Sequence, residues 1–311
     1  MSKKFKRVLC SLALASVVGV SAAASACTIK TKHPRAKITI EFNDETYDIE
    51  YTLYRNMYPQ TVQHFIELAD EGFYNDMIIH NYTSTDWFTG GYAYNDADDA
   101  GYSAAYTASS LGEYLEVTNK ESSYYDLAPS LSASVYKQLS YDGNRETVSK
   151  EDVLPTLIGE FSQNDHRIDK GALTADFGTL KMFYYNKGDT NQKVAIKNSS
   201  GQILEHDYSY NCATSLFAIQ TGSSSSYTES KYCVFARLRN DKARNRLNSL
   251  LDAIEDYRSD LDSTNTNFTR SVSTEVDNLD SFAKEGGQSI SQTFTMTQSP
   301  IVIKSVKITK Y

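Results

Sequence analysis

Two consecutive stretches near the start of the chain alternate between polar and apolar residues, and this pattern restricts the fold more than any other feature. Residues 36–42 (AKITIEF) and 46–54 (TYDIEYTLY) place an apolar side chain at every second position. Because successive side chains of a β-strand point to opposite faces, the alternation predicts two strands with one buried face each. The Asn43-Asp44 pair between them is typical of a tight turn, so we expect an antiparallel hairpin.

Apolar residues at helical spacing occur in three places, at residues 59–72, 247–261 and 272–282. Each pattern predicts an amphipathic helix that packs on the core. Pro59 suits the first turn of the first helix, and Gly72 can end it.

Strands account for most of the remaining pattern. They are predicted from short apolar runs at residues 73–82, 172–175, 215–221, 231–238 and 301–308. Residues 180–185 (LKMFYY) and 193–197 (KVAIK) look like an added hairpin around Lys187-Gly188-Asp189. Because strands dominate and helices are interspersed, the sequence favours a mainly β fold, a closed or nearly closed antiparallel barrel with added segments.

The bulk properties of the chain exclude some functions. Its 311 residues are 40% hydrophobic, which is enough to bury a core. The formal net charge of −8 argues against nucleic acid as a main partner, because that binding relies on Lys and Arg neutralising phosphates. The sequence has no CxxC pair and no histidine cluster at ligand spacing, so we expect no metal and no cofactor.

The first 26 residues are typical of a secretory signal. MSKKFKR is basic, and the stretch VLCSLALASVVGVSAAASA that follows carries no charge. Ala24-Ser25-Ala26-Cys27 resembles the lipobox of bacterial lipoproteins, in which the cysteine is acylated and becomes the new N-terminus. Ordinary cleavage after Ala26 and an uncleaved membrane anchor are the alternatives.

The lipobox interpretation predicts where the protein lies. Residues 1–26 would be removed, Cys27 would carry lipid, and residues 27–36 would form a tether. Losing the leader's four basic residues would change the net charge from −8 to −12, so the lipid and not charge would hold the body at an anionic membrane. We expect a protein lipid-anchored to the bacterial cell membrane on its extracytoplasmic side.

Tyrosine is abundant, at 23 copies, and many of these lie between Tyr82 and Tyr136 among Ser, Asp and Gly. Amphipathic residues that cover an elaborate loop region explain this composition. A carbohydrate- or peptide-binding surface is the alternative. We expect residues 95–157 to be an insertion with limited structure of its own.

Six segments, in this order, resemble the cyclophilin family of peptidyl-prolyl isomerases. ITIEF and YPQTVQHFIELADEGFYND are similar to the family's opening strand and its P-x-T-V-x-N-F helix, which ends in G-F-Y. IHNYTSTDWFTGGY lies where the family has F-H-R, a loop and Q-G-G-D, and IGEFSQNDHRIDKGALTAD resembles G-E-F…N…H…G-x-L-S-M-A. SLFAI corresponds to S-Q-F-F-I, KYCVFARL to H-x-V-F-G-x-V, and IVIKSVKI to the closing strand.

The resemblance implies a closed eight-stranded antiparallel β-barrel capped by two helices, with substrate bound in a groove on its outer face. The domain would span residues 37–311, with large insertions at 95–157, 177–210 and 262–298. Such a domain needs no cofactor for its reaction.

The implied reaction is rotation about an X–Pro peptide bond, which faces a barrier of about 18–20 kcal/mol. A catalyst holds the proline ring in an apolar pocket and binds the twisted state better than the planar one. A donor aimed at the proline nitrogen weakens the conjugation. In the family, an arginine directly after the histidine supplies that donor, and a glutamine before the paired glycines helps to hold the substrate backbone.

This sequence departs from the family at those two positions. Asn81 stands at the arginine position and Thr89 at the glutamine position, and they are the candidate catalytic residues. Asn is uncharged, and charged donors are roughly twice as strong. The resemblance implies a set of substrate-binding residues along the groove: His80, Asp86, Trp87, Leu216, Phe217, Ala218, Tyr227 and Tyr232. For two of them a packing role is the favoured alternative, in the core for Phe217 and at a strand end for His80.

Four replacements change the character of the implied pocket. Asp86 replaces a phenylalanine and Trp87 a methionine, while Leu216 and Ala218 replace the glutamine and the second phenylalanine of S-Q-F-F-I. Burying an unpaired carboxylate is expensive, so we expect Asp86 to point to water and the pocket to be shallow and wet.

Two other pairs of residues follow from the resemblance. Arg167 and Arg237 lie in segments near the groove and are candidates to supply the missing cation. Cys212 and Cys233 fall near neighbouring strands of the implied barrel, which predicts a disulfide in an exported domain.

We therefore expect a monomeric, cyclophilin-like isomerase that acts as a folding helper on proline-containing segments of exported proteins, with weak or lost catalysis. The alternative is a non-catalytic surface lipoprotein that uses the groove, or the Tyr-rich insertion, to hold a peptide or glycan.

Overall fold

The predicted N-terminal hairpin is confirmed in the computed structural model, as β1 (Arg35–Phe42) and β2 (Glu45–Leu53). A two-residue turn at Asn43 and Asp44, with φ angles of 49° and 62°, joins them. A tight hairpin turn of this kind needs positive φ at both positions, which Asn and Asp tolerate better than most side chains.

The structure describes residues 31–95, 105–107, 114–119, 157–158, 160, 168, 171–185, 193–197, 203–207, 212–223, 233–264, 266–277 and 289–311. Residues Lys32–Lys310 form one compact unit, and the fold described below is the fold of this unit. The expected signal at residues 1–26 lies outside the described residues. Within the described part of the chain, no helix has both the length and the apolar character needed to span a membrane.

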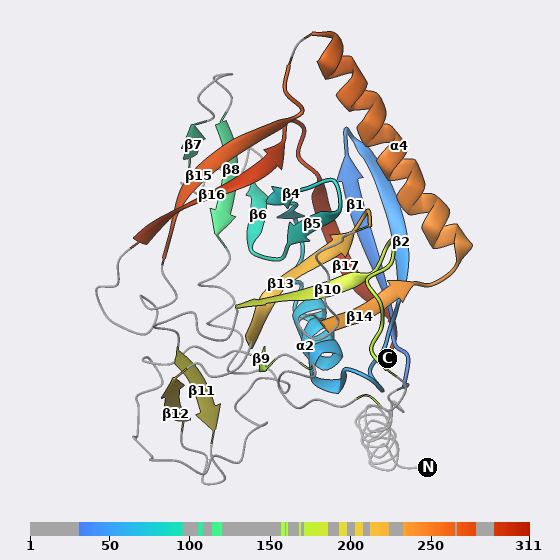
Figure 1. Cartoon of the computed structure of the whole chain (residues 1–311), viewed down its shortest axis with the longest axis vertical. Helices are drawn as coiled ribbons and strands as arrows, with labels where there is room; N and C mark the ends of the chain where they lie inside the picture. Colours follow the sequence, from blue (N-terminus) through green and yellow to red (C-terminus); the bar gives the residue numbers. More distant parts are fainter. Residues whose placement is uncertain are drawn as a thin grey trace, which may run out of the picture. The chain divides into compact units, whose positions relative to one another are not determined.

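Eight strand positions form an antiparallel barrel (Figure 1). β1 pairs on its other edge with β17 (Val302–Lys310), and β2 pairs with β14 (Cys233–Leu238). β10 (Leu180–Tyr185) lies between β14 and β13 (Cys212–Gln220). β13 pairs in turn with β5 (Asp86–Thr89).

One broken strand closes the ring. β3 (Met77–Ile78) pairs with β17, and β4 (Asn81–Tyr82) pairs with β5, so only Ile79 and His80 separate the two halves. The Ile79 N–H donates to the segment just before β17, whereas the His80 N–H donates to β5. The chain therefore changes partner between these two residues, and the expected closed eight-stranded barrel is confirmed.

The first predicted helix is α2 (Pro59–Asp70), which packs an apolar face into the barrel. The Phe65 ring contacts Phe217 of β13 and Phe235 of β14, at centroid distances of 5.5 and 5.1 Å. One helical side chain thus joins the helix to two barrel strands. Gly72, with φ of +70°, follows the last turn as the sequence predicts.

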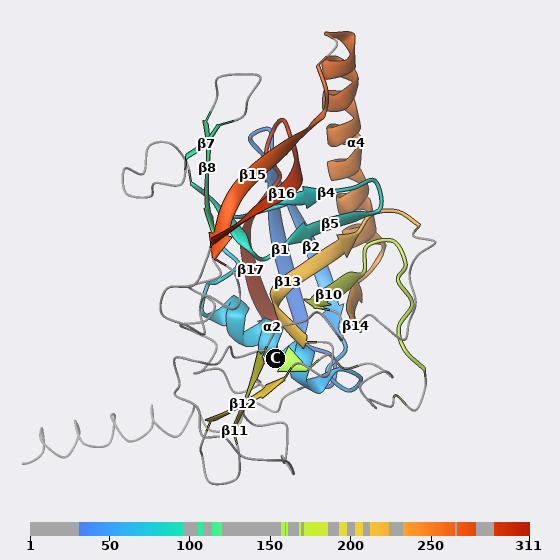
Figure 2. The same ribbon diagram turned by 60° about the vertical axis from the view of Figure 1, so that its left-hand side comes forward.

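The second predicted helix is α4 (Asp241–Ser263), and it runs alongside β2 and β14 (Figures 1 and 2). Its apolar residues, Ala243, Leu247, Leu250 and Ile254, are buried. The Asn240 side chain caps the first turn by accepting a hydrogen bond from the Ala243 N–H at 3.0 Å.

The third predicted helix, at residues 272–282, is wrong. Residues 269–277 form strand β15 (Thr269–Asp277), which pairs with β16 (Ser289–Thr297) in a separate two-stranded sheet. Val272 and Val276 are four residues apart, a spacing that shares one face of a strand as well as one face of a helix. The β-branched residues of this segment favour the strand.

Two strand predictions between residues 172 and 207 are also corrected. β11 (Lys193–Lys197) pairs with β12 (Ile203–Asp207) and not with residues 180–185. Residues 180–185 are β10, a barrel strand with a partner on each side, and residues 172–175 form no strand. The barrel strand therefore begins later in the chain than its pattern suggested.

A side branch extends the sheet from β3. β6 (Tyr92–Asn95) pairs with β3, β8 (Tyr114–Asn119) with β6, and β7 (Ala105–Thr107) with β8. β9 (Leu157–Ile158) pairs with the start of β13. Most of the Tyr-rich insertion expected at residues 95–157 lies outside the described residues.

The expected disulfide between Cys212 and Cys233 is not formed, because Cys233 is a buried free cysteine. β10 lies between the two strands that carry these residues, with Tyr185 opposite Cys212 and Met182 opposite Cys233. Two strand spacings amount to about 10 Å, and a disulfide needs Cα atoms within about 7 Å. The two cysteines are near in the sheet but are not neighbours.

Candidate functional site

One row of residues crosses four neighbouring strands on the outer face of the barrel. Asn81 on β4 lies opposite Phe88 on β5, Phe88 opposite Ala218 on β13, and Ala218 opposite Lys181 on β10. Directly opposite residues of antiparallel strands point to the same face. This face is the outer one, because Trp87, the neighbour of Phe88, belongs to the hydrophobic core.

Three of the predicted site residues point inward. Trp87, Thr89 and Phe217 are fully buried in the barrel. The Thr89 hydroxyl donates to the Ile78 carbonyl oxygen at 2.9 Å, so it is committed to the barrel wall. Thr89 therefore does not take over the substrate contact of the family's glutamine, and Trp87 and Phe217 serve the core.

Phe88 is a residue of this face that the sequence analysis missed. The alignment assigns contacts to residues 86, 87 and 89, but successive residues of one strand cannot all share a face. The observed register makes Asp86 and Phe88 the outward pair of β5. The strand period is the signal that could have identified Phe88.

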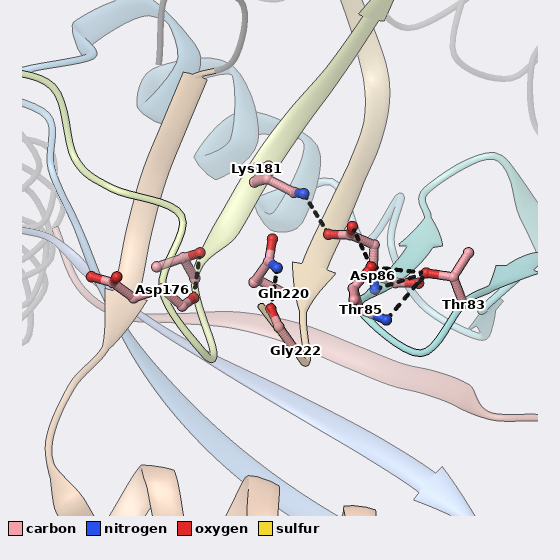
Figure 3. A network of polar contacts seen from close by, with 8 residues as sticks. Thr83, Thr85, Asp86, Asp176, Lys181, Gln220 and Gly222 are labelled. Carbon is pink, nitrogen blue, oxygen red and sulfur yellow. Dashed lines mark hydrogen bonds and ion pairs between the residues drawn. The ribbon is translucent and has the colours of Figure 1, made fainter. Parts of the chain in front are cut away.

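Asp86 forms an ion pair with Lys181 on this face (Figure 3). Lys181 starts opposite the small Ala218, and its Nζ reaches Asp86 Oδ1 on the next strand but one. The side chains are largely buried, with exposed fractions of 8% for Lys181 and 12% for Asp86. The expectation that Asp86 points to water is therefore wrong, because the lysine neutralises a carboxylate that would be expensive to bury alone.

Gln220 lies directly opposite Asp86, on β13, and is fully buried. Its Nε2 donates to the Gly222 carbonyl oxygen (Figure 3). Because a carbonyl can only accept, this contact assigns the nitrogen and the oxygen of the Gln220 amide. Gln220 Oε1 has no hydrogen-bond partner within the described residues. A buried acceptor without a donor is destabilising and calls for an explanation.

A hydrogen-bonded turn holds Asp86 in place. Thr83 Oγ1 donates to the Asp86 carbonyl oxygen at 3.0 Å and accepts from the Asp86 N–H at 2.9 Å. Thr85 Oγ1 donates to Asp86 Oδ2 at 3.2 Å. The carboxylate is thus anchored through both backbone and side chain, whereas Lys181 reaches it through a flexible four-carbon stem.

Arg237, one of the two cations expected near the groove, is engaged elsewhere. Arg237 donates to Thr174 Oγ1 at 3.0 Å and forms an ion pair with Asp176 Oδ2 at 3.4 Å. Arg167 lies outside the described residues. Lys181 is the cation that the described strands bring beside Asp86.

A sequence signal for Lys181 exists. Gly178, Leu180 and Met182 match three letters of the family pattern G-x-L-S-M-A, whereas residues 171–176 match only the first glycine and the leucine. Residues 180–185 also form the barrel strand, so the later match is the better alignment. It places Lys181 at the serine of the pattern.

Gly90 and Gly91 allow β5 to approach β13 closely. Gly90 has φ of +89°, and a Cβ there would collide with the Ser215 carbonyl oxygen. A Cβ on Gly91 would lie 2.7 Å from Leu216 Cδ2. The glycine pair therefore serves close packing, and Leu216 covers it.

His80 lies at the break between β3 and β4, with its ring 5.0 Å from the Tyr92 ring. Burial lowers the pKa of His80 from 6.5 to about 3. The imidazole is therefore neutral at physiological pH and supplies no positive charge to the site.

Glu160 has a structural role that the sequence did not reveal. Its carboxylate accepts hydrogen bonds from the N–H groups of Gln60 and Thr61, at 3.1 and 2.8 Å. These groups belong to the first turn of α2, whose N-cap residue Tyr58 makes no side-chain capping bond. Glu160 therefore caps α2 from far away in the sequence.

The predicted site is thus only partly assembled on one face. Asn81, Asp86 and Ala218 lie together there, with Leu216 two residues along β13 from Ala218. Tyr227, Tyr232 and Cys27 lie outside the described residues, and their roles stay predictions.

The solved structures to which this chain is similar include a cyclophilin type peptidyl-prolyl cis-trans isomerase of Cryptosporidium parvum. The identity is 13% and the TM-score 0.38, with 90% of this chain and 99% of that chain covered. For the same protein in the presence of the dipeptide Ala-Pro, the identity is 12% and the TM-score 0.38, with 89% of this chain and 99% of that chain covered. For the Mimivirus cyclophilin, the identity is 14% and the TM-score 0.29, with 70% of this chain and 78% of that chain covered.

Comparison with curated proteins found no match to this sequence. The family model described as "Cyclophilin type peptidyl-prolyl cis-trans isomerase/CLD" matches residues 37–276, which is well over half of the chain. This match agrees with the closed barrel and its two helices. The chain belongs to the cyclophilin-type peptidyl-prolyl cis-trans isomerase family.

Proposed function

We propose that this cyclophilin is a monomeric, lipid-anchored extracytoplasmic protein that binds proline-containing segments of exported polypeptides and isomerises them only weakly. Family membership supports peptide binding and the isomerase chemistry. The observation that carries the weak catalysis is the Asp86–Lys181 ion pair on the outer face. The leader and Cys27 support the location.

Among the described residues of the outer face, neither Asn81 nor Lys181 is a strong donor for the proline nitrogen. Asn81, at the arginine position, is neutral, and a neutral donor is roughly half as strong as a charged one. Lys181 is charged, but it is paired with Asp86 in largely buried surroundings. Moving the ammonium to a substrate would leave a buried carboxylate uncompensated, which is strongly unfavourable.

The same residues remove the apolar floor of the proline pocket. Where the family has two phenylalanines, this chain has Asp86 and Ala218, and Lys181 extends past Ala218. A proline ring gains binding free energy by burying apolar surface, and an ion pair offers none of that surface. Proline-containing peptides should therefore bind weakly at this position.

The test is to restore the family's residues and to measure X–Pro isomerisation. Asp86→Phe alone would leave Lys181 buried and unpaired, at a cost of about 3–5 kcal/mol. The variant to make is therefore Asn81→Arg with Asp86→Phe and Lys181→Ser. We expect the wild type to run near the uncatalysed rate and the triple variant to exceed it by at least about tenfold, since 1.4 kcal/mol of transition-state stabilisation gives that factor.

Two outcomes would count against this proposal. A wild-type rate typical of an efficient enzyme, unchanged by Asn81→Ala, would show that another donor does the work. A triple variant that folds and binds peptide but stays inactive would show that the missing groups lie elsewhere.

The ion pair also favours a second function, a non-catalytic peptide-binding module on the same scaffold. Asp86 and Lys181 form a charged pair on the outer face that isomerisation does not require. Peptide binding by the wild type with no measurable acceleration of X–Pro exchange would support this function over weak catalysis.

A further inference from the structure

We propose that Asp86 and Gln220 form a subsite for a cationic side chain of a bound peptide, and that the Lys181 ammonium, which is paired with Asp86, blocks this subsite until the peptide displaces it. The proposal rests on the proposed function in one respect, namely that the outer face binds peptides. It does not require that the protein isomerises them.

The subsite presents more acceptors than its own chain satisfies. Asp86 and Gln220 lie directly opposite each other on β5 and β13. Gln220 Oε1 is buried and has no partner among the described residues, while the Gln220 Nε2 is committed to Gly222. An ammonium carries three donors and a guanidinium five, so a cation suits two acceptors that lie on directly opposite residues.

The acceptors are fixed and the occupant is flexible. Thr83 and Thr85 anchor Asp86, and the Gly222 contact orients Gln220 (Figure 3). Lys181 enters on a stem with four rotatable carbons. Removing its ammonium would therefore leave a preformed site, and preorganised groups lose little freedom when a ligand binds.

Exchange of one cation for another keeps the charges balanced. A lysine or arginine of a peptide would replace the Lys181 ammonium beside Asp86, and the flexible stem of Lys181 would carry its own ammonium out to water, so that no buried charge stays unpaired. A carboxylate ligand would have to pair with Lys181 and leave Asp86 alone. A proline ring would satisfy neither Asp86 nor the Gln220 Oε1 acceptor.

The surroundings also suit an alkyl chain that ends in a positive charge. Ala218 is small and lies on the same face, and Phe88 next to it is half-buried, so methylene groups can pack there. The net charge of the chain is −8, which attracts basic peptides and repels acidic ones. Both features favour lysine or arginine over an acidic or neutral side chain.

The experiment measures fluorescence anisotropy with fluorescein-labelled peptides Gly-Ser-Xaa-Ala-Gly-Ser, where Xaa is Arg, Gln, Asp or Pro. We expect the Arg peptide to bind the wild type at least about tenfold more tightly than the other three. Asp86→Asn should remove that preference. Lys181→Met should strengthen binding of the Arg peptide by about tenfold or more, because the internal competitor is gone.

The matched control is Asp48→Asn. Asp48 forms an ion pair of similar type with Lys37, at 2.8 Å, but on the exposed surface of the hairpin. This change should leave all four affinities unchanged. Circular dichroism and thermal melting establish that each variant is folded. If Asp86→Asn does not fold, Gln220→Met replaces it in the test, because this change removes the second acceptor and should weaken the preference for the Arg peptide.

Equal affinity for all four peptides, no binding to any of them, or weaker Arg-peptide binding after Lys181→Met would each overturn the subsite. These outcomes are separable from failure of the proposed function. Equal affinities for the four peptides would contradict the cationic subsite but would still agree with a peptide-binding face. Efficient X–Pro isomerisation by the wild type would contradict weak catalysis but would not affect the preference for a cationic side chain.

Discussion

Buried polar residues determine most of the chemistry of this barrel, and two buried carboxylates are each held by specific partners. Asp86 is neutralised by Lys181, and Glu160 accepts two N–H groups at the start of α2. His80 is kept neutral by burial. These contacts join residues far apart in the sequence, so removing one partner leaves a buried group unsatisfied.

His80 predicts a pH dependence of stability. Its pKa is 6.5 unfolded and about 3 folded, so between these values the unfolded chain binds more protons. The free energy of unfolding should therefore fall as the pH drops below 6.5, by about 2 kcal/mol at pH 5. Urea unfolding at pH 7 and pH 5 measures this. His80→Gln should lose about this much of the pH dependence, while His33→Gln, at an exposed position, should keep it.

Glu160→Gln tests the distant cap of α2. The change removes a negative charge from the N-terminus of the helix and weakens two hydrogen bonds, so we expect a loss of about 1–2 kcal/mol in the free energy of unfolding. Glu71→Gln is the control, because Glu71 follows the other end of the same helix and caps no N–H of its first turn. Equal stability of Glu160→Gln and the wild type would show that the cap is unimportant.

Among the secondary-structure elements, the local sequence pattern predicts the element correctly where that pattern fits only one type of secondary structure. The hairpin at residues 35–53 and both confirmed helices follow from alternation, turn residues and helical spacing. Val272 and Val276 do not decide between helix and strand, because a spacing of four fits one face of either. The strand at residues 180–185 was placed outside the barrel because a weaker motif match came first in the chain.

The strand order predicts the state of the cysteines. Since β10 separates β13 from β14, Cys212 and Cys233 cannot pair without rearranging the sheet. Alkylation of the denatured, non-reduced domain from residue 28 onward should therefore label two thiols. In the native protein Cys233 should resist labelling, because burial raises the pKa of its thiol well above the usual range. A mass two units lower with no label incorporated would indicate a disulfide instead.

On the scale of the whole molecule, the sequence was enough to predict the barrel, but not the contents of its outer face. The ordered family segments place the strands, and the positions of Asn81, Asp86 and Ala218 follow from them. Gln220 could not be found in this way, and the family pattern places Lys181 on its strand without showing that it pairs with Asp86. Their roles depend on cross-strand register and on a partner that lies many residues away.

The leader predicts how the mature protein is held. If Cys27 is acylated, the wild type should partition into detergent, and Cys27→Ala should release it or block its processing. Ser25→Ala is the control, since it keeps a small residue before the cysteine. Recovery of the wild type as a water-soluble protein that begins at a free Cys27 would contradict the anchor.

The most direct test of the account is the rate at which the wild-type domain exchanges an Ala-Pro peptide between cis and trans, measured by NMR at equilibrium. We expect exchange close to the uncatalysed time of tens to hundreds of seconds, with no further loss in Asn81→Ala. Exchange at the catalytic efficiency of ordinary enzymes, about 10⁴ M⁻¹s⁻¹ or more, would contradict the claim that the Asp86–Lys181 pair has replaced a working proline pocket.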